Sequence, residues 1–161
     1  MTNYAEVAVE EATLVGMAIA VHAATKPDDM AIVDQKGGRL SWSEFNVKAN
    51  QLARYFRSQG LVEDDGVALL CSNRVEFPVV FMAALRCGVR VTPINWHLTG
   101  DEIGYIVDNC DAKLLIADAM FADKAIAAMG YSDKLLACIG IGIGIGRAIA
   151  DVADFDEVIN Q

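Results

Sequence analysis

The chain of 161 residues has the length of one ordinary domain, and 54% of its residues are hydrophobic, which is enough to bury a core. We therefore expect a single globular domain over residues 1–161. The formal net charge of -9 argues against a nucleic-acid partner. Binding to a nucleic-acid backbone depends on clustered lysine and arginine side chains that release counterions from the phosphates.

Four cysteines are spread through apolar stretches, and no two of them have the two-residue spacing of a zinc or redox motif. A reduced, cytoplasmic compartment is the simplest interpretation, with each thiol acting as a small hydrophobic side chain. We assign no catalytic residue and no metal ligand from the sequence. The cysteines are Cys71, Cys87, Cys110 and Cys138.

The first apolar segment, residues 12–24, follows Glu6, Glu10 and Glu11, where a signal peptide would carry positive charge. The segment is also shorter than the roughly 20 residues that a membrane span requires. We expect a helix that packs on the core, and no transmembrane segment.

Residues 30–34 and 39–42 are expected to form a short hairpin across a Gly-Gly turn. Ser41 and Glu44 then have the spacing of a capping box, in which each side chain accepts a hydrogen bond from the other residue's backbone N–H. The helix that begins there should end at Gly60. Its buried face should hold Phe45, Ala49, Leu52, Ala53 and Phe56.

The next strand is expected at residues 67–71. Asn73 and Glu76 repeat the cap spacing after it, and the helix that follows should end at Gly88. The apolar face of this helix should hold Phe77, Val80, Phe81, Ala84 and Leu85.

A further strand is expected at residues 89–94, and a helix capped by Thr99 and Glu102 follows it. The inward side chains of that helix should be Ile103, Ile106 and Val107. The remaining expected elements are a strand at residues 113–117, a helix at residues 120–129 ending at Gly130, and a strand at residues 135–141.

Continuous apolar strands joined by helices are typical of a parallel sheet covered on both faces. The expected fold class is therefore α/β, with a mostly parallel sheet flanked by helices. Trp96 and His97 follow the strand at residues 89–94, at the end of the strand where ligands of α/β sheets tend to bind. We regard them as candidate substrate-pocket residues, although a single histidine in a loop is more often structural or solvated.

Four stretches carry a resemblance by their order and spacing together. They are LSWSEF (residues 40–45), NRVEF (residues 73–77), ALRCGVRVTPIN (residues 84–95) and NWHLT (residues 95–99). The chain resembles the N-terminal region of the adenylate-forming superfamily, and most closely the AMP-forming acyl-CoA synthetases, over about residues 13–118. The resemblance implies that the chain is the N-terminal portion of the large AMP-binding domain of such an acyl-activating enzyme.

Enzymes of this family activate a carboxylic acid with ATP and Mg²⁺ to an acyl-adenylate and transfer the acyl group to coenzyme A. The resemblance therefore implies a parent enzyme that uses these cofactors on a fatty or other apolar carboxylic acid. The family's Ser/Thr/Gly-rich phosphate loop with its lysine has no counterpart in this chain, and neither have the family's later acidic residue and C-terminal lysine. We expect a scaffold that is inactive alone, holds no cofactor, and has the remainder of the parent chain as partner. An unpaired sheet edge should favour self-association.

Two alternatives remain open. The first is a stand-alone, non-catalytic binding or assembly module of the same fold. The second is an NAD(P)-binding oxidoreductase, because the run GIGIGIG from Gly140 to Gly146 resembles the cofactor loop of short-chain dehydrogenases. The stricter G-x-G-x-x-G pattern fails, since Ile145, Arg147 and Ile149 occupy its third glycine position in the three registers.

Overall fold

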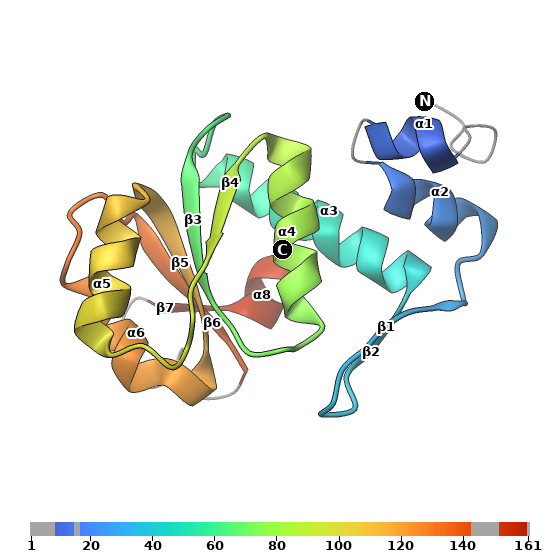
Figure 1. Cartoon of the computed structure of the whole chain (residues 1–161). Coiled ribbons are helices and arrows are strands. Elements are labelled where there is room, and N and C mark those ends of the chain that lie inside the picture. Colours follow the sequence, from blue (N-terminus) through green and yellow to red (C-terminus); the bar gives the residue numbers. More distant parts are fainter. Residues whose placement is uncertain (1–8, 15–16, 143–151, 161) are drawn as a thin grey trace.

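A five-stranded, all-parallel sheet forms the centre of the computed structural model, which describes residues 9–14, 17–142 and 152–160 (Figure 1). The strand order is β4-β3-β5-β6-β7. This arrangement confirms the expected α/β class. The strands are β3 (Gly66–Leu70), β4 (Arg90–Pro93), β5 (Ala112–Asp118), β6 (Ala137–Ile141) and β7 (Val152–Asp154).

Helices cover both faces of the sheet (Figure 1). One face carries α3 (Trp42–Ser58), α4 (Glu76–Cys87) and α8 (Phe155–Ile159). The other carries α5 (Gly100–Asn109), the 3-10 turn η1 (Ala119–Phe121) and α6 (Ala122–Met129). The helix expected at residues 120–129 is therefore split into a 3-10 turn and an α-helix.

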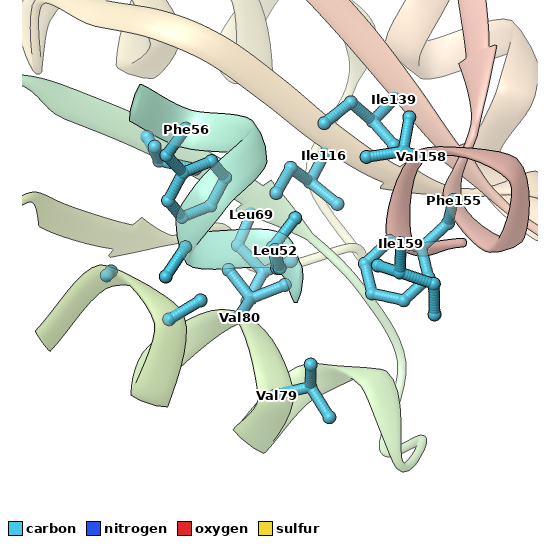
Figure 2. Close-up of a cluster of buried hydrophobic side chains, with 14 of the residues drawn as sticks. Leu52, Phe56, Leu69, Val79, Val80, Ile116, Ile139, Phe155, Val158 and Ile159 are labelled. Atoms are coloured by element: carbon cyan, nitrogen blue, oxygen red, sulfur yellow. The ribbon is translucent and has the colours of Figure 1, made fainter. Parts of the chain in front are cut away.

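Successive side chains of β3 enter two separate cores, as the pleat of a strand requires. Val67 and Leu69 pack with α3 and α4, whereas Ala68 and Leu70 pack with α5 and α6. Figure 2 shows the first of these clusters, in which Leu52 and Phe56 of α3 lie against the sheet and α4. A strand that is buried on both faces has no polar side, which is why the sequence shows β3 as one apolar run.

The N-terminal segment lies beside α3 (Figure 1). The single helix expected at residues 12–24 is two helices, α1 (Val9–Leu14) and α2 (Ala18–Thr25). Ile19 of α2 belongs to the core shared with α3, so the expected packing is confirmed. The hairpin is also present, with β1 (Met30–Val33) antiparallel to β2 (Arg39–Ser41).

Two capping boxes form as the sequence predicts. The backbone N–H of Ser41 donates to Glu44 at 2.7 Å while that of Glu44 donates to the Ser41 hydroxyl at 3.2 Å. Thr99 and Glu102 make the same reciprocal pair at 2.8 and 3.4 Å. Gly88 ends α4 in the left-handed conformation with φ of 69°, which a residue with a side chain rarely adopts.

The start of α4 differs from the expected one. Asn73 does not cap it, because the helix begins at Glu76 and its N-cap residue, Val75, already has helical backbone angles. The Glu76 side chain does not reach back to the backbone of residue 73 but binds Arg74. The prediction of a third capping box was therefore wrong.

The buried face of α4 is also rotated from the expected one. Its fully buried residues are Val79, Val80, Ala83 and Ala84, whereas Leu85 is 58% exposed and the aromatic side chains of Phe77 and Phe81 are half-buried. The reason is that α4 is apolar around most of its circumference, so the period of its sequence does not select one face. The face that packs most closely against α3 and the sheet consists of small side chains.

Candidate functional site

Three neighbouring strands end at the carboxyl edge of the sheet, where ligands of α/β proteins bind, and two of them place polar side chains there. The chain leaves β3 through Ser72, β5 ends in Asp118, and β6 is followed by Gly142. Because β3, β5 and β6 are adjacent and parallel, these ends lie at the same edge. The edge is therefore the candidate functional site of the described residues.

The Asp118 carboxylate is completely buried there. It accepts hydrogen bonds from the Ser72 hydroxyl at 2.6 Å, from the backbone N–H of Met120 at 3.1 Å and from Nη1 of Arg74 at 3.3 Å. A buried carboxylate is tolerated only when it is paired and hydrogen-bonded in this way. Asp118 thus joins the loops that follow β3 and β5.

Arg74 completes the cluster. Its Nε and Nη2 both donate to the Glu76 carboxylate at 3.1 Å, and Nη1 donates to Asp118, so every nitrogen of its guanidinium already has an acidic partner. Burial would lower the pKa of Arg74, but the hydrogen bond and charge of Glu76, with the charge of Asp118, raise it. Arg74 is therefore a permanent cation that is held by this chain's own carboxylates.

The β1–β2 hairpin adds a third carboxylate to the edge. Asp34 accepts from the backbone N–H groups of Lys36 and Gly38 at 2.8 Å each, and from that of Val75 at 3.2 Å. The pKa of Asp34 is lowered by these hydrogen bonds, most of all by the one from Gly38, although burial acts in the opposite direction. Asp34 consequently ties the hairpin to Val75, the residue that precedes α4.

A pocket of about 260 Å³ lies between the hairpin and the start of α4. Its lining includes Asp34, Asn73, Arg74 and Phe77. Arg74 is already held by Glu76 and Asp118, and Asp34 by backbone N–H groups, so this pocket presents no uncompensated cation to an anionic ligand.

The predicted pocket residues Trp96 and His97 lie after β4, also toward the carboxyl ends of the strands. The Trp96 ring stacks on His97 with centroids 3.6 Å apart and on Phe121 at 5.4 Å, and it stays 39% exposed. Lys124 Nζ donates to the Trp96 carbonyl at 2.7 Å. The structure thus gives both rings a packing role, and a role in substrate binding stays a prediction.

An apolar groove of about 420 Å³ lies over the opposite end of α4 from Gly88. It reflects the rotation of this helix, because Phe77 and Phe81, which were expected on the buried face, are only partly buried and line the groove together with Met82. Ile19 of α2 and Phe45 of α3 form part of its other wall. The groove was not foreseen from the sequence.

The polar cluster was also missed by sequence reasoning. A signal existed, since Asp118 is a carboxylate at the end of the apolar run LLIAD and Ser72 comes directly after the run VALLC. Their partnership depends on the adjacency of β3 and β5, which the spacing of residues does not reveal.

The glycine run begins inside the sheet. Gly140 belongs to β6, and Gly142 follows it with φ of 90°. A Cβ atom on Gly142 would lie 3.2 Å from Nη1 of Arg74, so this glycine leaves the space that the guanidinium occupies. Residues 143–151, which hold the rest of the dehydrogenase-like pattern, lie outside the described residues.

Comparison with known proteins identifies the family. The model of the AMP-binding enzyme family matches residues 19–144. A medium/long-chain-fatty-acid–CoA/3-oxocholest-4-en-26-oate–CoA ligase from Mycolicibacterium smegmatis is 29% identical over 98 residues, which are 61% of this chain and 18% of that protein. The chain thus spans less than one fifth of the length of this relative. The comparisons give no support to an oxidoreductase.

Solved structures show the same fold. A putative long-chain-fatty-acid CoA ligase from Rhodopseudomonas palustris superimposes with a TM-score of 0.79 at 23% identity, over 89% of this chain and 35% of that one. The N-terminal domain of FACL13 from Mycobacterium tuberculosis gives a TM-score of 0.71 at 28% identity, over 78% of this chain and 33% of that one. The chain therefore belongs to the AMP-binding enzyme family and has the α/β architecture of the N-terminal domain of its adenylate-forming members.

Proposed function

We propose that this chain is the N-terminal scaffold of an acyl-CoA synthetase that activates a fatty or other apolar carboxylic acid with ATP and transfers it to coenzyme A. The names of the ligases that resemble it support this reaction and this class of substrate. Catalytic groups and cofactor sites of such an enzyme would come from the remainder of the parent chain.

The observation that carries the scaffold role is that the cation at the carboxyl edge, Arg74, is already paired with carboxylates of this chain. Adenylation requires backbone N–H groups and a cation that converge on the phosphates, together with a metal ion. Arg74 is engaged by Glu76 and Asp118, and Asp34 lies beside it. Three carboxylates around one arginine repel a triphosphate, so these residues do not fit ATP.

A chimaera tests the proposed role in the parent reaction. Residues 19–144 of this chain replace the matching segment of the Mycolicibacterium smegmatis ligase, and the intact ligase serves as the positive control. We expect a folded chimaera that forms acyl-CoA from a medium- or long-chain acid with ATP and coenzyme A. A chimaera that melts cooperatively yet makes neither acyl-adenylate nor acyl-CoA would overturn the proposal.

An assembly module of the same fold is the second candidate, and the unpaired strands favour it. β4 and β7 are the outer strands of the described sheet. β4 carries Pro93, which has no backbone N–H to donate, and β7 has no such block. We propose self-association at β7, and light scattering over a concentration series should show a dimer or larger assembly. A monomer at the highest concentration would contradict it.

A cytoplasmic location is part of the same proposal. Each of the four cysteines is a free thiol, which supports a reducing compartment. Among the described residues, no helix has the length and apolar character that crossing a membrane demands.

A further inference from the structure

The polar cluster at the carboxyl edge connects four segments that are far apart in the sequence. Arg74 lies after β3, Asp118 ends β5, Gly142 follows β6, and Asp34 belongs to the hairpin. Arg74 binds Asp118 directly and lies against Gly142, and the next residue, Val75, donates to Asp34. One short piece of chain, residues 74–76, is therefore in contact with all the others.

Stability alone does not account for such a cluster. A buried ion pair pays for its attraction with the loss of hydration, and apolar side chains of similar volume often serve equally well. What an ion pair adds is direction, since an arginine fork accepts carboxylates only along its N–H bonds. Here the directions are fixed by Glu76 on one side of the fork and Asp118 on the other.

We propose that Arg74 is a positioning residue that holds the ends of β3, β5 and β6 and the hairpin in one fixed arrangement. Gly142, which has no side chain, leaves the space in which the guanidinium lies. This proposal concerns the residues of this chain alone and stands independently of the ligase reaction. Loosening Arg74 at any one of its contacts should loosen the others, including groups that Arg74 does not touch.

Two glycines of this chain provide a matched pair of alanine variants that test the contact with Arg74. Gly142→Ala introduces a Cβ against Arg74 at a positive φ. Gly60→Ala, at a residue that follows α3 and belongs to none of the four segments, has a positive φ as well, but its Cβ meets nothing within 4 Å. The difference between the two variants isolates the contact with Arg74 from backbone strain.

Hydrogen exchange of single amides, measured by NMR on the native protein, gives the readout. The reporters are the amide of Met120, which donates to Asp118, and the amide of Val75, which donates to Asp34. We expect Gly142→Ala to speed exchange at both by roughly tenfold or more, the effect of losing a charge-assisted hydrogen bond. Gly60→Ala should leave the exchange of Met120 and Val75 unchanged. In neither variant should the exchange of amides in the middle of β5 change.

Arg74→Met provides a second route to the same answer if Gly142→Ala does not fold. It should speed exchange at Met120 and Val75 as well, and Arg74→Lys should restore less than half of the protection because an ammonium cannot hold both carboxylates as a fork does. Two results would overturn the proposal. One is unchanged exchange at Met120 in the variant that folds, and the other is an equal increase at every amide, which global destabilisation alone produces.

Discussion

Replacing Phe56 by alanine tests the packing of α3 against the sheet. Phe56 is completely buried, and it lies in the cluster with Leu52, Leu69 and Val80 (Figure 2). Phenylalanine to alanine changes in such cores cost about 3–5 kcal/mol, because the transfer free energy of the ring is lost and a cavity remains. A domain of this size has a total stability of roughly 5–15 kcal/mol, so the variant should stay folded but be strongly weakened.

Urea unfolding followed by circular dichroism measures the effect. With a slope of about 2 kcal/mol/M, a loss of about 4 kcal/mol lowers the midpoint by about 2 M. Val47→Ala is the matched control, since Val47 lies on the same helix and is 48% exposed. It should change the stability by less than about 0.5 kcal/mol. A loss below about 1 kcal/mol for Phe56→Ala, or an equal loss for both variants, would refute the assignment of the buried face.

Further predictions concern other parts of the chain. Gly104→Ala should lower the melting temperature because its Cβ would overlap the Tyr131 ring, and it should lower it much less in a Tyr131→Ala background. An equal decrease in both backgrounds would rule out the overlap. The pKa of Asp65 is lowered, mainly by its hydrogen bond with a lysine, so its carboxylate stabilises the fold above the unfolded-state pKa and this contribution disappears as pH falls through the folded-state pKa. Asp65→Asn should therefore be less stable than the wild type in urea at pH 7, with the difference shrinking below about pH 4. Burial raises the pKa of Cys71 and of Cys138 to about 12, so mass spectrometry should find both unlabelled by iodoacetamide at pH 8 in the native protein and labelled in urea; rapid native labelling would contradict their burial.

Local signals in the sequence predicted local structure well. The spacing of Ser41 and Glu44, and of Thr99 and Glu102, gave two capping boxes that the structure contains. The apolar runs gave the strands β3, β5 and β6 within two residues at each end, because a strand buried on both faces has little choice of residue type.

Features that depend on the adjacency of distant segments could not be predicted in the same way. The pair of Arg74 and Asp118 joins residues 44 positions apart, and it exists only because β3 lies next to β5. The capping box expected at Asn73 and Glu76 is absent for the same reason, since Glu76 binds Arg74, which is held in turn by Asp118 of β5. The orientation of α4 was missed because both of its sides are apolar, and only tertiary packing chooses between them.

The proposal that this chain is a scaffold without adenylation machinery of its own is tested most directly by exchange of labelled pyrophosphate into ATP. The chain is incubated with ATP, Mg²⁺ and medium- or long-chain fatty acids, and the intact Mycolicibacterium smegmatis ligase is the positive control. We expect no exchange above the rate without protein. Acid-dependent exchange by the chain alone, at a rate proportional to its concentration, would contradict it.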